Sequence, residues 1–271
     1  MSPEPLSNPA TEKFDNLFDN LVDNSIDGSR DARRSTWRGL AKLCQRALPQ
    51  SCAFCAAPSG SSLVCVPCSN ALPRVDHACP RCALPAWNGA VCGACLTIPP
   101  PFAAAYAAFE YAFPFDRLLH AFKYGGRLAL ADFLAEALCA AVARRPPNHP
   151  MPDAVVALPL APSRQRARGF DQATEIARRV ARNIGVPMAT GLRRVRDTPA
   201  QAALPWKDRA KNVRGAFVAD PSFSGMRIAI VDDVMTTGAT LSSAASAALR
   251  AGALAVEAWA VARTLPPAHH P

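Results

Sequence analysis

The stretch IAIVDDVMTTGATL, residues 228–241, places two adjacent aspartates between an apolar run and a loop without charge. The run 228–231 is apolar and mostly β-branched, which predicts a buried strand. The residues TLSSAASAALRAGA at 240–253 predict a helix. Asp232 and Asp233 are therefore expected where a strand ends and a helix follows, at the edge where open α/β sheets bind ligands.

Strands and helices alternate through the C-terminal half of the chain. The patterns predict strands at 154–160, 187–192, 216–219, 226–231 and 255–263, and helices at 169–185 and 240–253. Upstream, a strand-like run at 102–113 precedes a helix that Gly125 ends and a second helix at about 128–144. Repeated units of this length predict an α/β fold with an open, doubly wound parallel sheet.

The loop after the aspartates has the composition of a phosphate site. Two neighbouring carboxylates repel one another unless a metal ion or vicinal hydroxyls lie between them. Small side chains, hydroxyls and the amides of a helix start attract phosphate. A diol beside a phosphate describes a ribose 5-phosphate, whereas GxxxxGK[ST] and GxGxxG are both missing. The simpler alternative is that the acids only cap the helix. The loop residues are Thr236, Thr237, Gly238, Ala239 and Thr240.

The positive charge of the chain is concentrated in one segment. Residues 161–214 contain 13 Lys and Arg against four acids, which accounts for the whole net charge of +9. We expect an anion near this segment, either phosphate, diphosphate or nucleic acid. Arg178, Arg179 and Arg182 fall on a predicted helix and suit a solvated face, so the arginines in the loops are the better candidates.

Eight of the ten cysteines lie between residues 52 and 95, in four CxxC pairs at nearly even spacing. Two such pairs complete the four-sulfur shell that zinc prefers, and the spacing indicates an internal duplication. Disulfides are the competing interpretation, and a chain without a secretion signal disfavours them. We infer two zinc ribbons with structural Zn²⁺, the first two CxxC pairs forming one site and the last two the other, while a cross-brace of alternate pairs stays open. The predicted ligands are Cys52, Cys55, Cys65, Cys68, Cys79, Cys82, Cys92 and Cys95.

Composition divides the chain into five parts. We expect a disordered or weakly helical tail at 1–35, a helix plus double zinc ribbon at 36–98, a connecting strand and helices packed on the main domain at 99–150, the main domain at 151–265, and a tail at 266–271. There is no apolar run long enough to span a membrane, and the start lacks the blocks of a secretion signal. We therefore expect a cytoplasmic protein.

The stretch at 228–241 resembles the phosphoribosyl-pyrophosphate motif of type I phosphoribosyltransferases. With four CxxC pairs upstream, the chain resembles the ComF/ComFC family, the competence-associated branch of that superfamily. The resemblance covers about residues 37–264 and includes HAFKYGGR (120–127), PLAPSRQRARGFDQA (159–173) and RRVRDTPAQAALPWKDRAKNVRGAF (193–217). It implies that the domain at 151–265 has the type I phosphoribosyltransferase fold.

The resemblance also implies roles for individual residues. Asp232 and Asp233 would face the ribose hydroxyls or the diphosphate-bound Mg²⁺, and the loop from Thr236 to Thr240 would hold the 5-phosphate. The loop 163–168 would meet the diphosphate, and 193–214 would form a hood over the ligand. Asp171 stands where we expect Asn and adds negative charge, so it is not included. The loop and hood candidates are Arg164, Arg166, Arg168, Arg194, Gln201, Arg209 and Asn212.

The resemblance implies a phosphoribosyl-pyrophosphate-binding protein that acts in natural competence, in the uptake or handling of single-stranded DNA. Single-stranded DNA and competence proteins are then its expected partners. The alternative is an active, magnesium-dependent phosphoribosyltransferase of nucleotide salvage with an unknown acceptor. The two hypotheses differ in turnover, and no base-recognition pocket is identifiable from the residues.

Overall fold

The computed structural model describes residues 50–60, 62–161, 165–166, 169–196, 213 and 215–266. The chain divides into two compact units, Met1–Pro49 and Gln50–Pro271, and every described residue belongs to the second. The predicted N-terminal tail, the helix expected after it and residues 267–271 lie outside the described residues.

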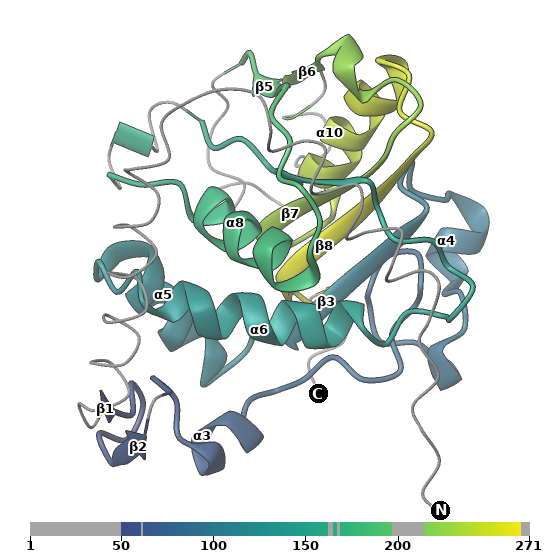
Figure 1. Ribbon diagram of the computed structural model, residues 1–271. Helices are drawn as coiled ribbons and strands as arrows, with labels where there is room; N and C mark the ends of the chain where they lie inside the picture. Colours follow the sequence, from purple (N-terminus) through teal and green to yellow (C-terminus); the bar gives the residue numbers. More distant parts are fainter. Residues whose placement is uncertain are drawn as a thin grey trace, which may run out of the picture. The chain divides into compact units, whose positions relative to one another are not determined.

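A four-stranded parallel sheet forms the core of the second unit (Figure 1). Each neighbouring pair of strands is parallel, and the segments between them include helices, as parallel connections require. This arrangement confirms the open parallel α/β sheet expected from the sequence. The strand order is β3 (Ala104–Glu110), β8 (Ala255–Arg263), β7 (Arg227–Met235) and β4 (Ala154–Ala157).

Helices cover both faces of this sheet. Buried side chains of β7 alternate between two cores, with Ala229 and Val231 in one and Ile228 and Ile230 in the other, as the two-residue period of a strand dictates. Three helices contribute to the first core and α10 (Ala239–Arg250) to the second, so the sheet is doubly wound. The helices of the first core are α5 (Phe115–Tyr124), α6 (Leu130–Val142) and α8 (Gln172–Ile184).

Two sequence predictions of strands need correction. Of the strand expected at 187–192, only a parallel bridge between Val155 and Met188 forms next to β4, because Pro187 has no N–H and Gly191 has a φ of 116°. Leu192 already belongs to the next strand, β5 (Leu192–Arg194). Conversely, the strand expected to end at residue 231 continues to Met235, since β8 pairs with it as far as the Met235–Arg263 register.

The segment before the sheet contains short elements in a repeated order. In each half, a short helix begins directly after the third cysteine of a group, with Cys65 and Cys92 as the residues before the helix. This repeat matches the duplication expected from the cysteine spacing. The elements are β1 (Gln50–Ser51), β2 (Pro58–Gly60), α3 (Val66–Asn70), the 3₁₀ helix η1 (Trp87–Gly89) and α4 (Gly93–Thr97).

The chain around Val75 and Pro80, at the start of the second cysteine group, lies along the outer edge of β3. The Val75 N–H donates to the Ala108 carbonyl at 3.2 Å, and the Ala105 N–H donates to the Pro80 carbonyl at 2.9 Å. An edge strand presents unpaired backbone groups, and these contacts satisfy part of them. The second cysteine group is therefore fixed to the sheet by backbone hydrogen bonds.

Two further pieces complete the described chain. The strands β5 (Leu192–Arg194) and β6 (Phe217–Ala219) form a separate antiparallel pair, and the 3₁₀ helix η4 (Pro221–Phe223) leads to β7. None of the helices in the described part of the chain has the length and apolar character needed to cross a lipid bilayer.

Candidate functional site

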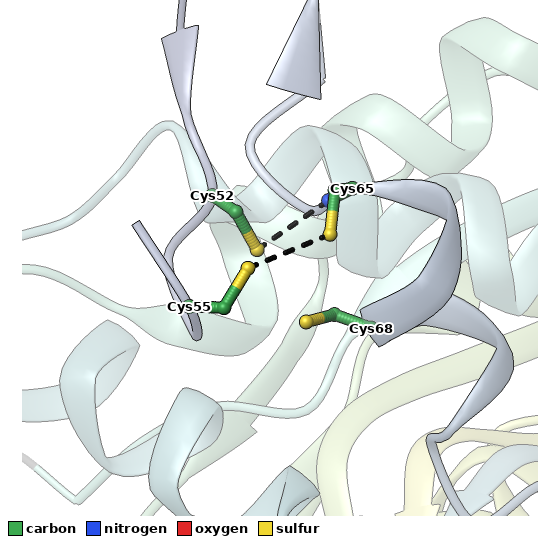
Figure 2. A group of neighbouring side chains, drawn as sticks. All are labelled: Cys52, Cys55, Cys65 and Cys68. Atoms are coloured by element: carbon green, nitrogen blue, oxygen red, sulfur yellow. Dashed lines mark hydrogen bonds between the residues drawn. The ribbon is translucent and has the colours of Figure 1, made fainter. Parts of the chain in front are cut away.

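The eight clustered cysteines form two groups of four thiols. Within each group, the sulfur atoms all lie within 4.8 Å of one another. Figure 2 shows the first group, in which four side chains point toward a common centre. Neighbouring CxxC pairs share a group, which decides for sequential ribbons and against the cross-brace. The groups are Cys52, Cys55, Cys65 and Cys68, and Cys79, Cys82, Cys92 and Cys95.

The spacing of the sulfur atoms fits zinc. A tetrahedral Zn²⁺ with bonds of about 2.3 Å separates its sulfur ligands by about 3.8 Å. The Cys55 and Cys65 sulfurs are 3.7 Å apart, and the Cys82 and Cys92 sulfurs are 3.6 Å apart. Because each group offers four thiols, a bound Zn²⁺ would have no open position, as in structural sites.

The duplication extends to the hydrogen bonds that favour thiolates. The sulfur of Cys52 accepts the N–H of Cys65 at 3.4 Å, and the sulfur of Cys79 accepts the N–H of Cys92 at the same distance. Burial raises the pKa of the Cys52 thiol, but the backbone donors outweigh it and lower the pKa to about 6. The same balance lowers the pKa of Cys79 to about 7. Both cysteines are therefore prepared to bind metal as thiolates.

The aspartate pair lies at the carboxyl end of β7, past the end of its neighbour β4. The last residue of β4, Ala157, pairs with Val231, so Asp232 and Asp233 extend beyond it. The Asp232 carboxylate accepts the N–H of Asp233 at 2.8 Å. This is the position in an open parallel sheet where ligands are bound.

Lys123, near the end of α5, reaches this pair. Its Nζ lies 2.9 Å from Oδ2 of Asp233, and the two side chains are only 16% and 14% exposed. Burial and then the charge of Asp233 raise the pKa of Asp232 to about 8, although Lys123 acts in the opposite direction. The pair therefore binds a proton near neutral pH, because the charge of Lys123 does not outweigh burial and the repulsion between the two carboxylates.

Asp171, the acid that departs from the expected motif, has a structural role. Its Oδ1 accepts the N–H of Thr174 at 3.1 Å and caps α8, while its Oδ2 accepts the N–H of Leu160 at 3.4 Å. Burial, and to a smaller extent the charge of Asp233, raise its pKa above the ordinary value. Asp171 thus ties the segment after β4 to α8 and adds a third carboxyl to the surroundings of the pair.

The loop between β7 and α10 has the geometry of a helix N-terminus. Gly238 is the residue before the helix and has a φ of 81°, in the left-handed region that glycine tolerates best. The hydroxyl of Thr237 accepts the N–H of Ala239 at 3.2 Å. A helix of this length exposes amides at its first turn, where an anion is stabilised.

Arg263, the last residue of β8, binds the backbone where β7 leads into this loop. Its guanidinium donates to the carbonyl of Met235 at 2.9 Å, to the carbonyl of Thr236, and to the carbonyl of Cys82 at 2.8 Å. Burial lowers its pKa to about 10, so the group keeps its charge at neutral pH. Arg263 therefore connects the loop to the second cysteine group.

The arginines and hood residues expected to bind ligand are only partly described. Arg166 is exposed in a short helical turn. Arg194 ends β5, with its guanidinium 5.3 Å from the centroid of the Phe217 ring. Arg164, Arg168, Gln201, Arg209 and Asn212 lie outside the described residues. The structure brings together the two aspartates and the phosphate-type loop, and it places Arg194 on a different pair of strands.

Comparison with known protein families supports the assignment of the cysteine groups as zinc sites. Residues 43–96 match the double zinc ribbon domain family. The chain is also 35% identical over 237 residues to the DNA utilization protein YhgH of Salmonella typhi, which covers 85% of this chain and 92% of the relative. Competence protein F of Haemophilus influenzae is 32% identical over 160 residues, 57% of this chain and 70% of that protein. The chain belongs to the ComF family.

Solved structures provide weaker comparisons for this ComF-family chain. A glutamine phosphoribosylpyrophosphate amidotransferase from B. subtilis aligns with 56% of the chain and 32% of its own length, at 22% identity and a TM-score of 0.35. A UMP synthase of Leishmania donovani aligns with 49% of the chain and 21% of its own length, at 22% identity and a TM-score of 0.29.

Two residues of the ComF-family site were missed by sequence reasoning. Lys123 is 110 positions from Asp233, and Arg263 is 181 positions from Cys82. The available signals were a lysine directly before a Tyr-Gly-Gly helix end and an arginine that closes a mostly apolar strand. Neither pattern specifies a partner, so only the packed sheet reveals these contacts.

Proposed function

We propose that this ComF-family protein binds phosphoribosyl pyrophosphate together with Mg²⁺ at the carboxyl end of β7. The observation that carries the proposal is the position of Asp232 and Asp233 directly before a loop whose Gly238 opens a helix. Carboxylates suit a ribose diol or Mg²⁺, and the first turn of a helix suits phosphate. The carboxylates and the start of the helix follow one another within a few residues. One ligand that carries both a ribose diol and a phosphate could therefore contact both.

Within this proposal, each group of residues has a distinct task. Asp232 and Asp233 bind the ribose hydroxyls or the metal, and Lys123 balances the charge of Asp233 until ligand arrives. Bound Mg²⁺ would neutralise the diphosphate oxygens. The loop residues Thr236, Thr237, Gly238, Ala239 and Thr240 hold the 5-phosphate. The basic loops supply Arg164, Arg166 and Arg168 to the diphosphate, and Arg194, Gln201, Arg209 and Asn212 to the hood.

Calorimetry with phosphoribosyl pyrophosphate and Mg²⁺ tests the binding. We expect one binding event per chain that is weakened at least tenfold in the double variant Asp232→Asn/Asp233→Asn, because charge-assisted contacts contribute about 1.5–3 kcal/mol each. Asp132→Asn is the matched control, since Asp132 lies exposed on α6 and pairs with Arg179. Equal affinity in the double variant and the wild type would refute the proposed site.

An assay for diphosphate release by the same protein tests the alternative that it is an active phosphoribosyltransferase. The raised pKa of Asp232 favours this second function, since a buried acid with a pKa of about 8 is suited to proton transfer near neutral pH. Steady release of diphosphate in the presence of a nucleobase would establish an enzyme. Binding without diphosphate release across a broad panel of bases would leave a binding protein.

The proposed biological role is the handling of single-stranded DNA during natural competence. The relatives are named for DNA utilization and competence, and the whole positive excess of the chain lies in residues 161–214. Phosphate contacts make nucleic-acid binding weaken as salt rises. We expect oligonucleotide affinity to fall with salt and with neutralisation of Arg164, Arg166 and Arg168. Oligonucleotide binding that changes neither with salt nor with neutralisation of these three arginines would exclude the basic segment as the DNA-binding region.

A cytoplasmic location is part of the same proposal. Eight cysteines are arranged as metal ligands, which suits a reducing compartment where thiols stay unpaired. Fractionation of cells that produce the protein tests this point, and recovery with the membrane or the exported fraction would contradict it.

A further inference from the structure

Arg263 is unusual among the described residues because it is charged and almost fully buried. Only 2% of its surface is exposed, although it ends the strand β8 next to the candidate ligand loop. A buried guanidinium loses its hydration, and the loss must be offset by well-placed acceptors. The acceptors of Arg263 therefore show which parts of the chain this residue connects.

The hydrogen bonds of Arg263 divide between two parts of the molecule. On one side, Nη1 donates to the carbonyls of Met235 and Thr236, where β7 leads into the loop. On the other side, Nε donates at 2.8 Å to the carbonyl of Cys82, a predicted zinc ligand. The carbonyl of Thr264 is a further acceptor at 3.0 Å. One rigid planar group thus fixes the loop entrance relative to the second cysteine group.

The two cysteine groups differ in their relation to this arginine. The turns are alike, since Ala83 after Cys82 has a φ of 56° and Ala56 after Cys55 has a φ of 59°, but Cys82 is buried. Cys55 holds the equivalent place in the first group, but it is exposed. A zinc centre of four thiolates also has a net negative charge, which suits a buried cation. The second group can therefore support Arg263 in a way that the exposed Cys55 does not.

We propose that Arg263 is a positioning residue that makes the order of the ligand loop depend on zinc in the second cysteine group. When zinc leaves that group, the turn at Cys82 loses the metal that organises it, and Arg263 loses an acceptor. The guanidinium then shifts, and the carbonyls of Met235 and Thr236 are released. The effect on ligand affinity rests on the proposed phosphoribosyl site, whereas the effect on loop order does not.

The duplication supplies a matched pair of variants for the test. Cys92→Ser removes the third cysteine of the second group, and Cys65→Ser removes the equivalent cysteine of the first. We expect each full-length variant to lose one zinc in metal analysis. Amide hydrogen exchange is read at Ala239 and Ser242, whose N–H groups donate to the Thr237 hydroxyl and the Gly238 carbonyl. It is expected to rise about tenfold in Cys92→Ser, as the loss of one charge-assisted hydrogen bond predicts, and to be unchanged in Cys65→Ser.

A second comparison isolates the arginine and avoids a folding ambiguity. Arg263→Met should raise exchange in the loop while both zinc ions are retained, and adding Cys92→Ser should then have little further effect. Arg250→Met is the control, because Arg250 lies exposed at the end of α10. If Arg263→Met does not fold, stepwise removal of zinc from the wild type by a chelator gives the same readout, with loop exchange expected to follow loss of the second zinc.

The outcomes separate this inference from the proposed function. Loop exchange that does not change with the second zinc, or that changes equally with either zinc, would overturn the role of Arg263. If loop exchange follows the second zinc while the wild type fails to bind phosphoribosyl pyrophosphate with Mg²⁺, the coupling stands and the proposed ligand is wrong. Where the ligand does bind, its affinity should fall about tenfold in Cys92→Ser and stay constant in Cys65→Ser.

Discussion

The proton affinity of Asp232 is set by its place at the end of β7. Its carboxyl lies beside Asp233 in a shielded position, and burial followed by that neighbouring charge raises the pKa to about 8. The only ion pair recorded for the two aspartates within the described residues joins Asp233 to Lys123. An ordinary acid thus becomes a group that exchanges its proton for a cation or a hydroxyl donor near neutral pH.

This shift predicts how stability depends on pH. In the unfolded chain Asp232 ionises near its ordinary pKa, but in the folded chain it keeps its proton until about pH 8, so its contribution to stability falls as pH rises through that window. Asp232→Asn should therefore melt a few degrees above the wild type at pH 8 without Mg²⁺, and the gap should shrink toward pH 5. Thermal denaturation from pH 5 to 9 measures this. A gap independent of pH would contradict the assigned proton.

At the scale of elements, the turn from β7 to α10 depends on one glycine. Gly238 has a φ of 81°, and a Cβ there would lie 2.8 Å from Cε of Met235. We expect Gly238→Ala to destabilise the fold by about 1–2 kcal/mol through backbone strain and to weaken phosphate binding. Chemical denaturation and calorimetry with phosphoribosyl pyrophosphate check the two effects.

Gly185 provides the matched control for this substitution. It ends α8 with a φ of 70°, and a Cβ there would meet no atom within 4 Å. Gly185→Ala should therefore lower stability by a similar amount and leave ligand affinity unchanged. Equal loss of affinity in both variants would mean that the loop has no specific role.

The elements that sequence predicted well are those with strong local patterns. The continuous apolar run at the start of β7 and the small residues of α10 identified the loop between them, because these local patterns do not depend on distant residues. The expected strand at 187–192 failed because Pro187 and Gly191 limit pairing with β4 to the Val155–Met188 bridge. The extension of β7 to Met235 was invisible because its partner β8 decides it.

For the whole molecule, zinc is the largest single source of stability that we expect outside the sheet. Each structural zinc contributes about 10–16 kcal/mol in isolated zinc-binding peptides at neutral pH. Metal analysis should find two zinc per chain, and a strong chelator should lower the melting temperature of the full chain. Fewer than two zinc per chain in freshly purified protein would contradict the double ribbon.

Contacts between distant segments explain what the whole-chain sequence could not reveal. The spacing of the CxxC pairs predicted the eight ligands and favoured sequential groups, and the packing then excluded the cross-brace that the spacing had left open. Likewise, Lys123 reaches Asp233 because α5 packs on the same core as β7, and Arg263 reaches Cys82 because the segment before Cys82 is hydrogen bonded to β3, the neighbour of β8. Sequence spacing carries no information on such neighbours.

The most direct test of the proposed ligand is a crystal structure grown with phosphoribosyl pyrophosphate and Mg²⁺. We predict that the 5-phosphate lies on the backbone amides of the loop from Thr236 to Thr240, with the carboxylates of Asp232 and Asp233 on the ribose hydroxyls or the metal. A phosphoribosyl ligand bound elsewhere, or a loop and aspartate pair that stay free of ligand at saturating concentration, would contradict the account.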